Sequence, residues 1–278
     1  MGWPTILIIA LVVAAIGAVA YWQLIIAEGV YLGQPLVTWL YDLTAPRYDR
    51  IKQFNTLFET RFLGRPLAAE LRNRPSPFVL DIATGSGRLP LTLLAQPGFH
   101  GRIIGLDVSR PMLEQAAANL SGYHQVELIW RDARHLPFPD GCFDAVTMLE
   151  MLEFTPSPTA QLREAVRVLR PGGLLLTTRR RGLDARLMPG KTFSKAAFER
   201  LLGDIGMVSI AIEVWQVDYD LVWARRTGNS GGGARPLVEV LRCPACGASN
   251  LAQDDHTLRC ESCGREYPIS DGIIDLHR

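Results

Sequence analysis

The sequence predicts an α/β protein in which an open sheet carries helices on both faces. After Pro75-Ser76-Pro77, short β-branched or apolar runs alternate with helix-like segments, and a glycine-rich turn follows the first run. A chain of 278 residues, 48% of them hydrophobic, can bury a full core. The net charge of +1 provides no global attraction to nucleic acid, so any basic surface must be local.

The N-terminal segment is expected to anchor the protein in a membrane. Residues 2–27 contain no charged side chain, and the apolar run 6–26 is long enough to span a bilayer as one helix. Trp3 stands near one end, and Tyr21 and Trp22 near the other, where amphipathic rings favour the membrane interface. We expect a single-pass helix comprising residues 1–27.

A cleaved signal peptide is the alternative interpretation, because Ala18-Val19-Ala20 resembles a cleavage site. Two features argue against it: no Lys or Arg precedes the apolar run, and the run continues past the possible cut. The positive-inside rule places the rest of the chain in the cytoplasm, because basic residues lie only downstream of the run: Arg47, Arg50, Lys52, Arg61 and Arg65.

The juxtamembrane segment, residues 28–75, is expected to be helical. Its first part carries Tyr31, Trp39 and Tyr41 among aliphatic residues. Such a helix either lies along the membrane surface or packs over the core domain, and periodicity alone does not separate the two.

Seven runs are candidate strands, and helices are expected between them. Ser109 is a predicted N-cap with Pro111 in the first turn, and Arg170-Pro171-Gly172-Gly173 is a predicted helix stop. The candidate strands are Phe78–Ile82, Arg102–Asp107, Val126–Arg131, Phe143–Leu149, Leu174–Thr178, Met207–Val214 and Tyr219–Ala224.

The turn in "VLDIATGSGRLP" is a candidate ligand loop, because ligands of open α/β sheets bind beyond the carboxyl ends of the strands. Pro90 stands where a dinucleotide-binding turn needs its third glycine, and no Gly-Lys-Ser/Thr of a P-loop follows. Asp107 ends the second strand and is suited to accept from ribose hydroxyls, while Asp132, with Ala133, follows the third strand and is suited to an adenine amino group. These features predict a nucleoside site without a phosphate site.

Residues 41–226 resemble class I S-adenosylmethionine-dependent methyltransferases of the broad methyltransferase-domain type. The resemblance is carried by "VLDIATGSGRL", "GLDVSRPMLEQA", "RDARHLPFPDGCFDAV" and "LREAVRVLRPGGLLLTT", in this order. It implies a Rossmann-like, seven-stranded sheet with S-adenosylmethionine as cosubstrate. Ala83 stands where many relatives have glycine. The cofactor-binding residues implied are Asp81, Ala83, Thr84, Gly85, Ser86, Gly87, Asp107, Val108, Met112, Asp132, Ala133 and Leu149.

The catalytic residues are not evident from the sequence. Phe154 occupies a place where several relatives carry His or Asn. Glu150 and Glu153 are the nearest ionisable candidates, with Tyr48 and Asp49 in a segment that folds over the cofactor in relatives. Methyl transfer from a sulfonium needs orientation and exclusion of water more than a strong base.

The C-terminal tail is expected to bind structural zinc. Cys243, Cys246, Cys260 and Cys263 form C-x2-C-x13-C-x2-C, and four thiolates close a tetrahedral Zn²⁺ shell. The tail resembles the zinc-ribbon activator of tRNA and release-factor methyltransferases, which implies a docking, stabilising or substrate-presenting role; a ribbon without a partner is the alternative. The predicted domains are 1–27 (anchor), 28–75 (lid), 76–226 (methyltransferase), 227–236 (flexible linker) and 237–278 (zinc ribbon).

Three functions are compatible with these features. We expect a membrane-anchored methyltransferase acting on a small, lipid-soluble acceptor such as a quinone precursor or a lipid. A methyltransferase of RNA or protein that uses the ribbon for docking is the second; nucleic acid is disfavoured, because Arg179–Arg181 is a short basic run and no extended basic stripe is present. A noncatalytic membrane scaffold is the third.

Overall fold

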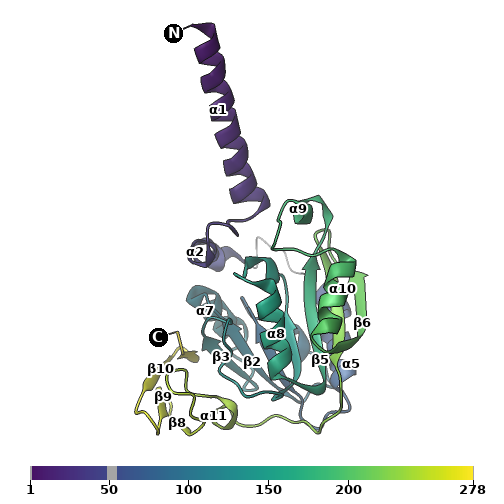
Figure 1. The fold of residues 1–278 in the computed structure, drawn as a ribbon. Helices are drawn as coiled ribbons and strands as arrows, with labels where there is room; N and C mark the ends of the chain where they lie inside the picture. The colour runs from purple at the N-terminus through teal and green to yellow at the C-terminus, as the bar shows by residue number, and fades with distance from the viewer. Residues whose placement is uncertain (1, 49–54, 278) are drawn as a thin grey trace.

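A central sheet organises the chain between an isolated N-terminal helix and a small C-terminal unit (Figure 1). The computed structural model describes residues 2–48 and 55–277. Asp49, which belongs to the lid segment predicted from the sequence, lies outside the described residues. The strands of the main domain are β1 (Phe78–Ile82), β2 (Arg102–Asp107), β3 (Val126–Trp130), β4 (Phe143–Met148), β5 (Leu169–Arg180), β6 (Met207–Val214) and β7 (Tyr219–Arg226).

The prediction of an α/β fold is confirmed, but the strand number was wrong. Across the described residues the sheet has 11 strands in the order β6-β7-β5-β4-β1-β2-β3-β11-β10-β9-β8. Strands β1 to β5 pair in parallel, and β7 is antiparallel to both β5 and β6. The additional strands come from the tail: β8 (Leu251–Gln253), β9 (Thr257–Cys260), β10 (Glu266–Ser270) and β11 (Ile273–Asp275).

The tail joins the sheet through β11, which pairs in parallel with β3, Ile273 opposite Leu128 and Asp275 opposite Trp130. The seven-strand prediction failed because the free edge of β3 offers unpaired backbone groups that a distant strand satisfies. Apolar side chains of the tail, among them Leu237 and Tyr267, share one buried cluster with the main domain. The ribbon and the sheet therefore share one core.

Helices cover both faces of the sheet (Figure 1). Ser109, Ser157 and Ser194 cap α7, α8 and α10 through side-chain oxygens that accept from backbone N–H groups, as expected for Ser109. The helices of the domain are α4 (Thr56–Glu59), η3 (Thr60–Gly64), α5 (Arg65–Leu71), α6 (Arg88–Leu94), α7 (Arg110–Asn119), η4 (Leu152–Phe154), α8 (Pro158–Val168), α9 (Gly182–Arg186), α10 (Lys195–Asp204) and α11 (Leu237–Val240).

The segment 227–236 lies along the domain and is hydrogen-bonded to it. Ala234 donates its N–H to the carbonyl of Ser76, and Arg170 donates to the carbonyl of Gly233 at 3.1 Å. A side chain at Gly232 would overlap the carboxylate of Asp144, so only glycine fits at this position. These contacts describe how the main domain and the tail are joined. The domain boundaries themselves stay predictions.

The N-terminal helix projects from the domain (Figure 1). It comprises α1 (Trp3–Tyr21) and the π-helical turn η1 (Trp22–Ile26). Together they make 24 residues, and their most apolar 18-residue window has a mean hydropathy of 2.4. This helix is long and apolar enough to cross a membrane, and the window is not buried in the described chain. A signal sequence passes the same test of length and composition. Next come α2 (Gln34–Thr44) and the short 3-10 turn η2 (Ala45–Arg47), and α2 lies over the carboxyl ends of the strands.

Candidate active site

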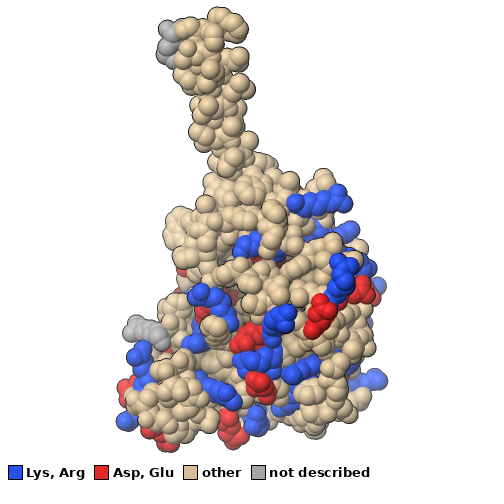
Figure 2. Space-filling model, viewed as in Figure 1, with Lys and Arg blue, Asp and Glu red and all other residues tan. Residues whose placement is uncertain are grey.

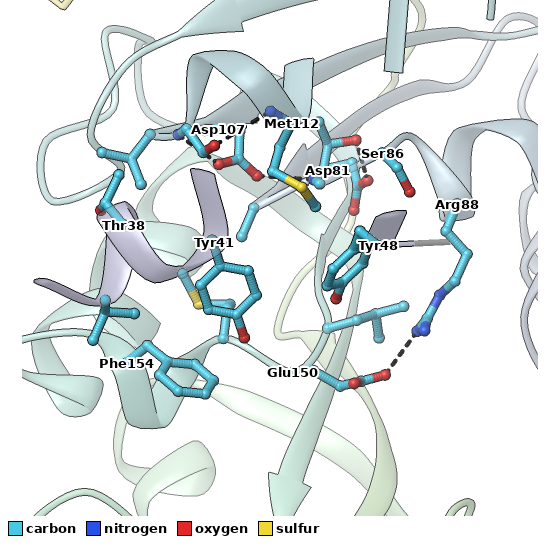
Figure 3. A pocket seen from close by; sticks show the side chains of 18 of the residues that line it. Thr38, Tyr41, Tyr48, Asp81, Ser86, Arg88, Asp107, Met112, Glu150 and Phe154 are labelled. Carbon is cyan, nitrogen blue, oxygen red and sulfur yellow. Dashed lines mark hydrogen bonds and ion pairs between the residues drawn. The ribbon is translucent and has the colours of Figure 1, made fainter. Parts of the chain in front are cut away.

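A pocket of about 960 Å³, partly open to solvent, lies where β1, β2 and β4 end and α2 covers them (Figure 3). In Figure 3, Asp81 and Asp107 lie along one side of the pocket, and Tyr41 and Phe154 lie opposite. Most of the predicted cofactor residues line it: Asp81, Ala83, Thr84, Gly85, Ser86, Asp107, Val108, Met112 and Leu149. The topology thus gathers residues that are up to 68 positions apart in sequence (149 − 81).

The loop after β1 has the backbone that its glycines predict. Gly85 and Gly87 have φ angles of 56° and 82°, and Ala83, which stands where many relatives have glycine, has a φ of 56°. A left-handed alanine is strained, and such strain concentrates at functional sites. A Cβ at Gly87 would come within 2.8 Å of Leu120 Cδ1, which explains the need for glycine there. Gly87 does not line the pocket but precedes α6 as its N-cap.

Asp107 is held rigidly at the end of β2. Its Oδ2 accepts the N–H of Gly85 at 2.8 Å, and its Oδ1 accepts the N–H of Ser109 at 2.9 Å. Burial raises the pKa of its carboxyl group, and hydrogen bonds from Ser109 and Gly85 oppose the rise. Because a carboxylate can accept about four hydrogen bonds, Asp107 retains capacity for a further donor, as the expected ribose contact requires.

Asp81 lies at the end of β1, buried beneath the loop. The hydroxyl of Thr147 donates to its Oδ1 at 2.6 Å, and that of Thr84 donates to its Oδ2 at 2.7 Å. Burial raises its pKa to about 6, although both hydrogen bonds favour the carboxylate. A cationic ligand in the pocket would favour the ionised form of this group.

Asp132 and Ala133 line a smaller neighbouring cavity of about 340 Å³, which shares Ala83, Asp107 and Val108 with the main pocket. Asp132 accepts from the backbone N–H of Arg134 and pairs with its guanidinium at 2.8 Å. The two cavities adjoin at Asp107, which is the arrangement a nucleoside needs if its sugar and base are bound by separate groups.

The catalytic candidates are separated by the fold. Glu150 and Tyr48 line the pocket, and Glu150 has a φ of 52°. Glu153 does not line it: its carboxylate accepts a hydrogen bond from the Tyr219 hydroxyl and lies 3.5 Å from Arg180 Nη1. Burial raises the pKa of Glu153. The helical turn after β4 thus directs Glu153 away from the cavity that Glu150 faces.

Arg88 is a pocket residue that the sequence analysis did not identify. It pairs with Glu150 at 3.0 Å (Figure 3). It also pairs with Glu59 at 3.3 Å, and its guanidinium lies 5.3 Å from the ring centre of Trp215. The one feature of the sequence that could have pointed to Arg88 is that it is the single charged residue of the otherwise apolar segment "RLPLTLL". The partners of Arg88 come from distant segments, so local sequence does not reveal the cluster.

Helix α2 forms an apolar roof that was also not predicted in detail. Val37, Thr38 and Tyr41 face the pocket, and the Tyr41 ring meets Phe154 edge-on at 5.8 Å between centroids. Burial raises the pKa of Tyr41 far above its ordinary value, so its phenol stays neutral. Asp42 accepts a hydrogen bond from the Ser109 hydroxyl, which fastens the roof to the start of α7.

The four tail cysteines converge on one point. Their sulfur atoms all lie within 4.8 Å of one another, with 3.7 Å between Cys243 and Cys263 and 3.6 Å between Cys246 and Cys260. A tetrahedral zinc ion with Zn–S bonds of about 2.3 Å separates its sulfurs by about 3.8 Å. The cluster therefore has the donors and dimensions for Zn²⁺, and four thiolates leave no open position for catalysis.

Two family models match the chain. Residues 80–177 match the methyltransferase domain, and residues 235–272 match the Trm112p-like protein family. Among curated proteins, the demethylmenaquinone methyltransferase of Lactiplantibacillus plantarum is 34% identical over 140 residues, covering 49% of this chain and 59% of the relative. That of Symbiobacterium thermophilum is 36% identical over 137 residues, covering 48% and 55%. The chain thus matches little more than half the length of these relatives.

Three solved structures share the fold. A SAM-dependent methyltransferase from Aquifex aeolicus has a TM-score of 0.52 at 21% identity, covering 66% of this chain and 97% of its own. The [4+2]-cyclase SpnF scores 0.55 at 19% identity, covering 71% and 98%. A chain from a complex of the Haloferax volcanii Trm112 methyltransferase activator with a proposed methyltransferase scores 0.51 at 21% identity, covering 67% and 97%. At these identities the likeness concerns the fold alone. The family matches and the fold together show that this chain carries a methyltransferase domain followed by a Trm112p-like domain.

Proposed function

We propose that the protein is a membrane-anchored methyltransferase whose acceptor is a small lipid-soluble molecule, with a quinone precursor as the favoured class. One observation carries the proposal: the pocket joins a polar wall with two buried carboxyl groups to an apolar roof, and the roof follows the apolar N-terminal helix in the chain. The relatives named demethylmenaquinone methyltransferase support a quinone-type acceptor. The basic residues downstream of the apolar helix support a cytoplasmic domain.

The residues of the pocket would act mainly by binding and orientation. S-adenosylmethionine supplies a methyl group on a sulfonium: its S–CH₃ bond breaks as the acceptor–CH₃ bond forms, and the acceptor loses a proton. Asp107 would hold the ribose, Asp81 and the glycine loop would hold the methionine part, and Val108, Met112 and Asp132 would surround the adenine. Val37, Tyr41 and Phe154 would exclude water from the transfer. Glu150 and Tyr48 stay the candidates for contact with the acceptor.

The methylation of RNA or protein is less well supported. Arg179 and Arg181 both pair with Asp220, and Arg180 pairs with Glu28 at 2.8 Å, so this basic run is engaged within the protein. On the face shown in Figure 2, blue and red side chains are interspersed and form no basic stripe. The Trm112p-like match supports a protein partner in addition, although β11, which directly follows the matched residues, already pairs with β3 of the same chain.

The test is to supply methyl-labelled S-adenosylmethionine to membranes that contain the full-length protein, and to follow label into lipid, RNA and protein fractions. We expect label in the lipid extract, and strongly reduced label with an Asp107→Ala variant. Asp140→Ala, an exposed acid paired with Arg167, is the matched control and should leave labelling unchanged. Labelling confined to RNA or protein would exclude the lipid-soluble acceptor. Absence of calorimetric binding of S-adenosylhomocysteine would favour a noncatalytic scaffold.

A further inference from the structure

Helix α2 is apolar on both faces, although it lies at the surface. Its inner face lines the pocket through Val37, Thr38 and Tyr41. Its outer face exposes Trp39 and Leu43, which are 54% and 60% accessible and stand one helical turn apart. The charged residue of the helix, Asp42, is bound by Ser109. A helix that is apolar all round is normally covered on both sides.

A second apolar surface lies beside it, on α9 and the residue that ends α9. Leu183 is 74% accessible and Leu187 is 47% accessible. In Figure 1, α2 and α9 occupy the same end of the domain, on either side of the base of α1. Figure 2 shows that the surface directly below the base of α1 is uncharged on the face shown. Arg186, at the end of α9, is exposed near these leucines. Exposed apolar side chains gathered at one end of a domain, rimmed by charged residues, are typical of an interaction site.

The apolar N-terminal helix is fastened to this end of the domain. Trp22 donates its indole N–H to the carbonyl of Leu187 at 3.0 Å, and the Tyr31 hydroxyl donates to the carbonyl of Pro189 at 2.9 Å. Ala27, Val30 and Met188 are buried together between these bonds. The helix therefore leaves the domain at a defined point.

The ion pair between Glu28 and Arg180 strengthens this attachment, because Arg180 is buried at the end of β5. An apolar helix held by several contacts cannot swing freely about its base. If it spans a bilayer, the surfaces of α2 and α9 that flank its base lie at the level where the helix leaves the lipid. Tryptophan is the residue type most suited to that layer, and Trp39 is placed there.

We propose that the outer face of α2 (Trp39 and Leu43) and the exposed face of α9 (Leu183 and Leu187) rest in the interfacial layer of the same bilayer that α1 spans. This inference rests on the membrane anchor in the proposed function, and does not depend on methyl transfer. It gives α2 two roles, since the helix that touches lipid on one side is the roof of the pocket on the other. A lipid-soluble acceptor would then reach the pocket beside α2 without crossing bulk water.

Quenching of tryptophan fluorescence tests the inference on the full-length protein. The protein is reconstituted in vesicles of phosphatidylcholine and phosphatidylglycerol, and in the same lipids brominated in the upper half of the acyl chains. The emission of Trp39 is the difference between the wild type and Trp39→Phe. We expect brominated lipid to abolish most of that difference. Trp223, half-buried on β7, is the control, and its contribution, measured with Trp223→Phe, should be unchanged.

A second reporter keeps the result independent of one side chain. A tryptophan introduced by Leu43→Trp in the Trp39→Phe background should be quenched by brominated lipid as Trp39 is, because the two positions share a face. If brominated lipid quenches Trp3 and Trp22 but neither of the two α2 positions, the inference is overturned and the anchor is kept. A second copy of the chain covering α2 would produce this result. Absence of any quenching would overturn the inference and the anchor together. Neither result depends on detecting methylated product.

Discussion

The backbone N–H of Gly85 donates a 2.8 Å hydrogen bond to Oδ2 of Asp107, which ties the loop after β1 to the end of β2. Asp107 thereby shapes the loop and also faces the pocket. One carboxylate thus couples the conformation of the glycine loop to the polar wall of the site.

Replacing Asp107 with Ala should weaken binding of S-adenosylhomocysteine. The variant loses the expected ribose contact and leaves the N–H groups of Gly85 and Ser109 without this acceptor. Loss of charge-assisted hydrogen bonds worth about 2–3 kcal/mol corresponds to roughly 30- to 150-fold in the dissociation constant. Isothermal titration calorimetry measures the change. Asp140→Ala should bind like the wild type, and equal affinity of both variants would exclude Asp107 from the site.

Binding of the cationic cosubstrate should strengthen as pH rises through about 6. Burial raises the pKa of Asp81 from 3.8 to about 6, and the carboxylate that forms above this value attracts the positive ligand. The raised pKa of Asp81 has the opposite effect on folding stability, because the folded state without ligand favours the protonated form. The contribution of Asp81 to stability is fully present below pH 3.8 and is lost as pH rises through about 6.

Titrating S-adenosylmethionine binding between pH 5 and 8 tests this dependence, with Asp81→Asn as the comparison. The asparagine variant should bind more weakly and show a flatter profile, because residue 81 no longer titrates. A wild-type profile that is flat across this range would show that Asp81 does not control the affinity.

Replacing any one of the four tail cysteines with Ser should release bound zinc and unfold the tail. The tail is small and shares its core with the main domain, so loss of the metal should also expose the edge of β3. Metal content and thermal unfolding are the measurements. Cys142→Ser is the control, because Cys142 is buried in the main domain outside the cluster and the variant should retain zinc. Retention of zinc by a Cys260→Ser variant would contradict the proposed ligand set.

Replacing Glu153 with Ala should destabilise the protein rather than remove a catalytic group. The substitution deletes the acceptor for the Tyr219 hydroxyl and a neighbouring carboxylate of the buried Arg180. Removing one partner of a buried ion pair costs about 3 kcal/mol in the free energy of unfolding. Chemical denaturation measures this cost. Glu70→Ala, which breaks an exposed pair with Arg225, should cost less than about 1 kcal/mol.

Glu153→Gln separates the structural role from a catalytic one, because glutamine still accepts from Tyr219. We expect this variant to lose less stability than Glu153→Ala, because only the ion pair with Arg180 is lost, and to keep the methyl transfer of the wild type. A stable Glu153→Gln protein without transfer activity would instead make Glu153 a participant in the reaction.

Local sequence was sufficient for the elements that depend on neighbouring residues. The bounds predicted for β1, β2 and β6 agree with the structure, and the cap at Ser109 forms as expected. These features depend on short runs of apolar or β-branched side chains and on a hydroxyl placed before a helix, so a short window of sequence contains their cause. The spacing of the tail cysteines similarly predicted their convergence.

Other features depended on segments that meet only in the folded chain. The pairing of β11 with β3 adds the ribbon to the sheet, the turn after β4 sends Glu150 into the pocket and Glu153 away from it, and Arg88 collects partners from three distant segments. The sequence by itself determined an apolar N-terminal helix, an α/β domain with a nucleoside-type loop and a four-cysteine tail, because each arises from local periodicity or spacing. Only the tertiary structure decided that α2 roofs the site, that Arg88 pairs with Glu150 and Glu59, and that the ribbon joins the sheet. These features arise from burial and hydrogen bonding between residues far apart in the chain.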